Sequence, residues 1–231
     1  MVRVFIDAGH GGKDPGAIGN GMREKDITLL VAKKLGAILE RHNVNVSYSR
    51  IMDKYVSLNE RARMANNIKA DIFVSIHTNS YKYQSVQGLE TFSYPGSSKG
   101  RKLAKYIQDS IIETKLYTKD RGIKTANFAV LRQSKMPATL VELGFITNKQ
   151  DSQLLRTRQN NFSEAIAKGI LKYLEVKYIP VKEKLEGNKY FRVVAGSYKD
   201  RSLAEEQQLR LKEKGFDSFI DIYEDKQSLI L

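Results

Sequence analysis

Two histidines and a glutamate lie at positions where three segments of the chain are expected to meet. His10 follows the apolar run 4–8, and His77 ends the apolar run 70–77. If both runs are buried strands of one parallel sheet, their carboxyl ends share an edge, and Glu24, just before a predicted helix, faces that edge. Two histidines and a glutamate are the ligands of many catalytic zinc ions, which keep a fourth position open for water. The sequence therefore predicts a Zn²⁺ site formed by His10, Glu24 and His77.

Each histidine taken alone has a simpler interpretation, because a histidine after a strand is more often a solvated loop residue than a ligand. Their joint placement is what favours the metal. Asp14 is a candidate to orient one of the imidazoles. The third histidine, His42, lies at the polar end of a predicted helix and is assigned no role.

Glu142, in the segment PATLVELGFITN, is the candidate catalytic base. It ends an apolar strand, where a carboxylate is unfavourable unless it is paired or used. Burial would raise its pKa toward neutrality, which suits a group that takes a proton from water. The alternative is a structural glutamate at the edge of the sheet, paired with an arginine.

The glycines around His10 resemble a phosphate-binding loop but do not fit one. The stretch GHGGKDPG has neither a dinucleotide fingerprint that opens a helix nor the G-K-[ST] ending of a nucleotide-binding loop. A nucleotide-binding protein is therefore disfavoured. We expect the glycines to leave room for the metal and a bulky substrate.

Periodicity predicts strands that alternate with helices. This order is typical of an α/β fold, a mostly parallel twisted sheet with helices on both faces. The expected strands are 2–8, 44–48, 70–77, 88–94, 127–132 and 138–146, and the expected helices are 26–42, 57–68, 99–116 and 162–174.

The chain is expected to have two parts, a domain over residues 1–176 and a small β-α-β segment over residues 189–231. Residues 177–188 are predicted to be a linker. In the small segment, strands are predicted at 190–198 and 216–223, with a helix between them that opens on a Ser202/Glu205 capping box and ends at Gly215.

Charge and composition limit the partners. Residues 1–180 carry 29 Lys and Arg against 16 Asp and Glu, whereas residues 181–231 carry 10 of each. A basic surface favours binding to polyanions such as anionic wall polymers. Nucleic acid is not an expected partner, because the sequence has no arginine-rich block.

The sequence contains no apolar run long enough to predict insertion into a membrane. It also contains no cysteine that could form a thiolate site. The N-terminus shows no signal peptide, so we expect cytoplasmic synthesis and action on the wall after lysis or non-classical release.

The motifs VFIDAGHGGKDPGA, LNERARMAN, SIHTN and VELGFITN, together with Glu24, resemble the zinc-dependent N-acetylmuramoyl-L-alanine amidases of the Amidase_3 family. The resemblance covers residues 2–175 in order. It implies that His10, Glu24 and His77 are the zinc ligands and that Glu142 is the catalytic glutamate. Glu90 lies in a family-typical segment, GLETF, where a structural pairing and a substrate contact are equally open.

Residues from Tyr190 onward resemble the first half of a SPOR repeat, a module that binds peptidoglycan glycan strands. A full unit repeats the β-α-β pattern, so we expect two chains to pair through this segment as a homodimer.

The implied function is hydrolysis of the amide between N-acetylmuramic acid and the L-alanine of the stem peptide, in an autolysin, for example one of sporulation, or a phage endolysin. The alternatives are a zinc peptidase that cuts the stem peptide and a wall-binding protein without catalysis.

Overall fold

The computed structural model describes residues 2–117, 119–180, 196–216, 218–220 and 222. The chain divides into two compact units, Met1–Pro180 and Val181–Leu231, and each unit is described by itself. Most of the expected linker 177–188 lies outside the described residues, and the domain boundaries stay a prediction.

The first unit is built on a six-stranded sheet in the order β4-β1-β5-β8-β6-β7. All neighbouring strands are parallel except β6, which runs antiparallel to β8. A short antiparallel hairpin, formed by the two-residue strands β2 and β3, lies outside this sheet. The strands are β1 (Arg3–Ala8), β2 (Ile18–Gly19), β3 (Met22–Arg23), β4 (Asn45–Tyr48), β5 (Ile72–Asn79), β6 (Leu89–Ser93), β7 (Asp120–Thr125) and β8 (Ala138–Phe145).

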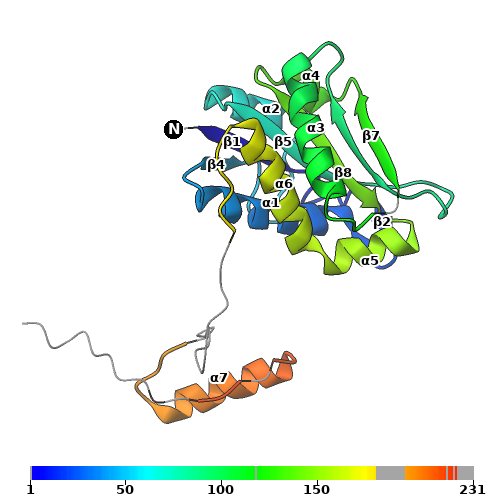
Figure 1. Cartoon of the computed structure of the whole chain (residues 1–231). Helices are drawn as coiled ribbons and strands as arrows, with labels where there is room; N and C mark the ends of the chain where they lie inside the picture. Colours follow the sequence, from blue (N-terminus) through cyan, green and yellow to red (C-terminus); the bar gives the residue numbers. More distant parts are fainter. Residues whose placement is uncertain (1, 118, 181–195, 217, 221, 223–231) are drawn as a thin grey trace, which may run out of the picture. The chain divides into compact units, whose positions relative to one another are not determined.

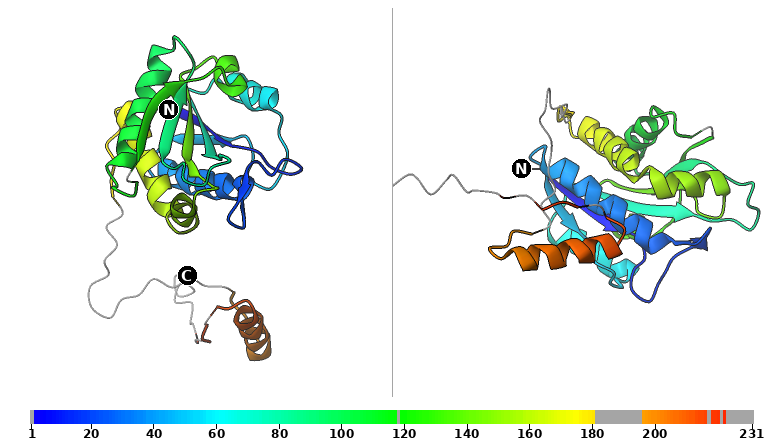
Figure 2. Two further views of the ribbon diagram at one scale, coloured as in Figure 1. Left: turned by 90° about the vertical axis from the view of Figure 1, so that its right-hand side faces the viewer. Right: turned by 90° about the horizontal axis from the view of Figure 1, so that it is seen from below.

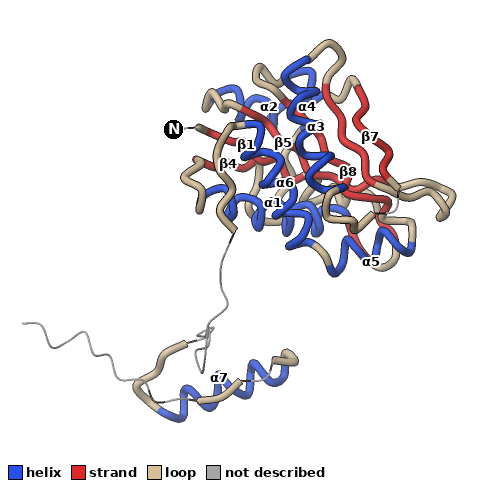
Figure 3. Tube along the Cα trace, in the orientation of Figure 1, coloured by secondary structure: helices blue, strands red, loops and turns tan. Residues whose placement is uncertain are grey.

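Helices cover both faces of the sheet, which confirms the predicted fold class (Figures 1 and 2). The tube in Figure 3 separates the helices from the strands between them. The helices of this unit are α1 (Glu24–Glu40), α2 (Leu58–Asn67), α3 (Ser98–Ile112), α4 (Ala129–Gln133), α5 (Lys149–Thr157) and α6 (Gln159–Tyr173).

Two hydrophobic clusters lie on opposite faces of the sheet. The larger one packs alternate residues of β1, β5 and β8 against α1, α3 and α6. The smaller one contains Phe5, Phe73 and Leu140, with residues of α2 and α4. Because side chains alternate across a strand, these three residues define the second face of the sheet.

On this second face the side chains change from apolar to polar toward the carboxyl ends of the strands. In β1, Asp7 lies two residues after Phe5, and in β8, Glu142 lies two residues after Leu140. In β5, Phe73 is followed on the same face by Ser75 and then His77. The second face is therefore a core at one end and a polar floor at the other.

In the first unit the predicted strands and helices are confirmed except at the points that follow, and one helix, α5 (Lys149–Thr157), was not predicted. Residues 127–132 were expected to be a strand, but α4 occupies Ala129–Gln133, because a short apolar run does not distinguish a strand from a buried helical turn. The strand at this place is instead β7, Asp120–Thr125, an edge strand whose polar sequence gave no signal. α1 begins at Glu24, so Glu24 belongs to the helix rather than preceding it.

The second unit contains α7 (Arg201–Glu213). Its N-cap is Asp200, whose carboxylate accepts a hydrogen bond from the Ser202 amide, so the expected Ser202/Glu205 capping box is wrong by two residues. Most of the strand expected at 190–198 and part of that at 216–223 lie outside the described residues. Within the described part of the chain, no helix has the length and hydrophobicity needed to cross a membrane.

Candidate active site

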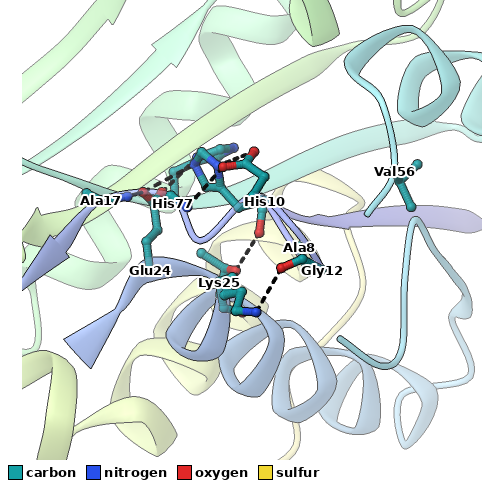
Figure 4. A network of polar contacts seen from close by, with 12 residues as sticks. Ala8, His10, Gly12, Ala17, Glu24, Lys25, Val56 and His77 are labelled. Atoms are coloured by element: carbon teal, nitrogen blue, oxygen red, sulfur yellow. Dashed lines mark hydrogen bonds and ion pairs between the residues drawn. The ribbon is translucent and has the colours of Figure 1, made fainter. Parts of the chain in front are cut away.

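The loop after β1 positions His10. His10 itself has a left-handed backbone, with φ of 59°, which is uncommon for a residue other than glycine. The loop is closed by backbone hydrogen bonds between Gly11 and Asp14 in both directions. This turn directs the His10 ring toward α1, as Figure 4 shows.

Glu24 lies between the two histidines. Its Oε2 is 3.2 Å from His10 Nε2, and its Oε1 is 2.9 Å from His77 Nδ1. The same carboxylate accepts hydrogen bonds from the amides of Ala17 and Thr78, each at 2.9 Å. Since backbone amides fix both oxygens, the position of Glu24 does not depend on the histidines alone.

The three predicted ligands therefore converge. One nitrogen or oxygen atom from each of His10, Glu24 and His77 lies within 4.8 Å of the others. The two imidazole rings meet edge to face, with centroids 4.9 Å apart. Asp14 Oδ2 lies 2.8 Å from His10 Nδ1 and so fixes the ring nitrogen that faces away from Glu24. This is the orienting role that was expected of Asp14.

Two glycines leave room for these side chains. A Cβ at Gly9 would lie 2.4 Å from the His77 ring, and a Cβ at Gly16 would lie 2.7 Å from both Glu24 Oε2 and the His10 ring. The glycines were expected to leave space for metal and substrate. In the structure, Gly9 and Gly16 make space first for the side chains of the three predicted ligands.

The ionisation of the cluster follows from its geometry. Burial disfavours the charged form of each group, but the contacts among them outweigh it. The two histidines hold the pKa of Glu24 well below its usual range, and Glu24 raises the pKa of both histidines, that of His10 to about 9. The site thus concentrates negative potential where a cation can replace the two imidazole protons.

Glu142 lies in β8 directly beside His77 of β5 in the strand register. Its Oε2 is buried and has no hydrogen-bond partner among the described residues. Burial raises the pKa of Glu142 to about 7, with a further contribution from the Glu24 and Glu90 carboxylates against the opposing effect of His77. The alternative of a glutamate paired with an arginine at the sheet edge does not hold, because β8 is an inner strand and no described arginine pairs with Glu142.

A buried ion pair beneath the site was not foreseen. Arg61 of α2 donates to Asp7 Oδ1 at 2.7 Å and to the carbonyl oxygens of Ala8 and His10 at 2.6 and 2.7 Å. Asp7 Oδ2 accepts from Ser75. The signal was available in the sequence, since Asp7 is a carboxylate inside an apolar strand, but its partner is 54 residues away.

Glu90 and His42 have structural partners. Glu90, in β6, is ion-paired with Arg121 and Lys124 of β7 and accepts a hydrogen bond from Asn79. His42 is remote from the ligands, and its Nε2 accepts a hydrogen bond from the Ile179 amide while its ring stacks on Tyr178.

The donor set suits a divalent cation of the zinc class. Two imidazoles and a carboxylate converge, the outer nitrogen of His10 is held by a carboxylate, and an unpaired carboxylate oxygen lies beside them. Nitrogen ligands of this kind disfavour calcium and magnesium, which prefer oxygen.

Family comparisons agree with this arrangement. The N-acetylmuramoyl-L-alanine amidase family, Amidase_3, matches residues 4–172, and the SPOR domain family matches residues 160–221. The SPOR match thus begins within α6, earlier than the expected segment 189–231.

Individual relatives point the same way. The chain is 41% identical over 225 residues to a sporulation-specific N-acetylmuramoyl-L-alanine amidase of Bacillus subtilis (strain 168), covering 95% of this chain and 84% of that protein. It is 43% identical over 182 residues to the endolysin of Bacillus phage SPP1, covering 75% of this chain and 66% of that protein. Among solved structures, the N-acetylmuramoyl-L-alanine amidase AmiC2 of Nostoc punctiforme is similar with a TM-score of 0.72 and 44% identity, over 75% of this chain and 97% of that one.

Proposed function

The chain belongs to the N-acetylmuramoyl-L-alanine amidase family, and from that premise we propose a zinc-dependent mechanism for its peptidoglycan hydrolysis. The bond cleaved joins the lactyl group of N-acetylmuramic acid to the L-alanine of the stem peptide. In this proposal His10, Glu24 and His77 hold the zinc ion, and Glu142 is the general base. The observation that carries it is the convergence of the three ligand atoms beside a buried, unpaired carboxylate oxygen.

Zinc bound here would polarise the scissile carbonyl and lower the pKa of a coordinated water to about 7. The protein's part is to place the three ligands before the metal arrives. Asp14 fixes the His10 ring, and two backbone amides fix the Glu24 carboxylate.

Glu142 would move the proton. Burial raises the pKa of Glu142 toward neutrality, which suits a carboxylate that accepts a proton from the attacking water and returns it. The proton then goes to the nitrogen of L-alanine as the amide bond breaks, and the products are a lactyl carboxylate and a free amino group.

The C-terminal match supports binding to peptidoglycan as well as hydrolysis. The match to the sporulation amidase includes this part of the chain, whereas the match to the phage endolysin covers 75% of the chain. We therefore place the activity in wall lysis of the sporulation type. Pairing of two chains through the C-terminal segment and attraction to anionic wall polymers are parts of the same proposal.

Product analysis tests the assignment. Digestion of purified walls should release new amino termini that are all L-alanine, without new reducing sugar. New amino termini on other residues of the stem peptide would identify a zinc peptidase instead. Release of no product, with binding to the walls retained, would identify a binding protein without catalysis.

A further inference from the structure

A row of charged side chains continues from Glu142 across the sheet. The register of β6 and β8 places Glu90 directly opposite Glu142. On the next strand, β7, Arg121 Nε lies 2.8 Å from Glu90 Oε2, and Lys124 Nζ donates to the same oxygen. These cations therefore lie beside the proposed base, on the polar floor of the second face.

The two cations of the cluster share one directly paired carboxylate. Glu90 forms an ion pair with each of them, and the Asp151 carboxylate acts on Arg121 from a greater distance. The Glu90 side chain is 5% exposed, whereas those of Arg121 and Lys124 are 27% and 41% exposed. Among the described residues, Arg121 Nη2 has no hydrogen-bond partner, and Lys124 Nζ has Glu90 alone. Glu90 thus fixes two cationic groups that keep donors available for a further anion.

The distance along the sheet indicates where such an anion lies on the substrate. Neighbouring strands are about 4.8 Å apart, so Glu90 on β6 is about one strand spacing from Glu142, and the cations that reach it from β7 lie between one and two strand spacings away. An extended peptide advances about 3.3–3.6 Å per residue. An anion at this place is therefore about one to three residues beyond the bond on which Glu142 acts, with the second residue at the centre of that range.

We propose that Arg121 and Lys124 bind a carboxylate of the stem peptide, that of the second residue after the muramoyl group. This inference rests on the proposed amidase function and specifies which side of the scissile amide lies over β6 and β7. The glycan side offers no carboxylate there, since the lactyl carboxyl is consumed in the amide.

An anionic wall polymer is the other source of negative charge. The position of the cluster favours the peptide, because it is in register with Glu142 and its carboxylate is buried in the sheet floor. A site for a long polymer needs cations spread along an outer surface.

The test compares two soluble substrates that differ in one group. N-acetylmuramoyl-L-alanyl-D-isoglutamate carries the carboxylate, and its isoglutamine counterpart carries a carboxamide. The full chain loaded with zinc is assayed as wild type, Lys124→Gln and Arg121→Gln. Lys105→Gln is the matched control, because Lys105 is exposed on α3 and pairs with Asp109 away from the site.

We expect wild type and Lys105→Gln to prefer the carboxylate substrate by about 10-fold in kcat/KM, mainly through KM. Lys124→Gln and Arg121→Gln should lose most of this preference, so that the ratio of kcat/KM for the two substrates falls toward 1 in each variant. Thermal unfolding of both variants checks that Arg121→Gln, the less exposed of the two, remains folded.

The results that would contradict the inference can be distinguished from one another. Equal cleavage of both substrates by wild type, or an unchanged preference in Lys124→Gln, overturns the inference and leaves the amidase function intact. Cleavage of neither substrate by wild type overturns the proposed function as well. If Lys124→Gln is impaired on walls that carry anionic polymer but not on the soluble substrates, the anion is the polymer and the peptide assignment is wrong.

Discussion

Glu24 is the residue that joins the parts of the candidate site. Each of its oxygens contacts one histidine and one backbone amide, so the carboxylate is held in place by the loop Ala17 and the strand residue Thr78. A ligand fixed in this way loses little conformational freedom when a metal binds. Glu24 is therefore held in place by contacts within the protein itself.

Gly16→Ala tests whether the ligand side chains need the space that glycine leaves. Gly16 and Gly21 both have left-handed backbones, with φ of 66° and 73°, but a Cβ at Gly21 meets nothing within 4 Å. Both substitutions should lower the free energy of unfolding by about 1–3 kcal/mol through backbone strain. Gly16→Ala alone should also weaken zinc binding, by about 10–100-fold.

Zinc affinity measured by competition with a chromophoric chelator distinguishes the two variants. Equal zinc affinity in Gly16→Ala and Gly21→Ala would mean that the contact of Gly16 with His10 and Glu24 is unimportant.

Residue types and spacing were enough to select His10, Glu24 and His77 as candidates that converge, because each lies in or next to a strand or helix that the structure contains. They were not enough to find the Asp7–Arg61 pair. That pair depends on how α2 packs over the sheet, and local sequence patterns do not specify the packing of distant elements.

At the scale of elements, one face of the sheet accounts for both stability and the site. The alternation in β1, β5 and β8 places apolar residues under α2 and α4, and places Asp7, His77 and Glu142 beyond them. Arg61 connects the two regions, since it projects from α2 to Asp7 and to the loop that bears His10. The helix that covers the core therefore also anchors the site.

Asp7→Asn should be strongly destabilising at neutral pH, by about 3–5 kcal/mol, because it leaves the buried Arg61 without its carboxylate. Burial alone would raise the pKa of Asp7, but Arg61 outweighs it and holds the pKa below its usual value. A lowered pKa means that the carboxylate stabilises the fold above about pH 4, its unfolded value, and that this contribution is lost as the pH falls further.

Chemical denaturation at pH 7, 5 and 3.5 measures this effect. The difference between wild type and Asp7→Asn should be constant from pH 7 to 5 and smaller at pH 3.5. The exposed Asp109→Asn, which removes a surface pair with Lys105, is the control and should change stability little at any pH. A difference that does not shrink in acid would contradict the assigned pairing.

The two errors around residues 120–133 share a physical cause. β7 is a polar edge strand, and α4 is a five-residue helix whose apolar residues fill the second core. Both are defined by their neighbours rather than by their own periodicity. The same strand supplies Arg121 and Lys124, so a sequence without a predicted β7 also gave no indication of the cationic cluster.

At the scale of the whole molecule, both hydrophobic clusters of the described residues belong to the first unit, and so does the excess of positive charge in the sequence. Both hydrophobic clusters draw their members from residues 1–180, and α7 has no buried residue. The excess of 13 positive charges also lies in residues 1–180, whereas residues 181–231 are balanced. The two units should therefore bind walls by different forces.

A chain that ends at residue 180 should keep its thermal stability and its rate on soluble muramoyl peptides. Its binding to walls should weaken steeply as salt rises from 0.05 to about 0.5 M, because screening weakens long-range attraction. The full chain should retain binding at high salt through its C-terminal unit. The fraction of each chain that sediments with walls measures binding, and both chains carry Glu142→Gln so that the walls are not digested. Equal salt dependence of the two chains would show that the C-terminal unit does not contribute to binding.

The most direct test of the account combines metal content with amide cleavage. Wild type stripped by a chelator, wild type restored with one equivalent of zinc, and Glu142→Gln are compared for release of L-alanine amino groups from walls. We predict that the stripped enzyme is inactive, that one zinc per chain restores it, and that Glu142→Gln binds one zinc but is at least about 100-fold slower. Full activity in the metal-free enzyme or in Glu142→Gln would contradict zinc-dependent catalysis with Glu142 as the base.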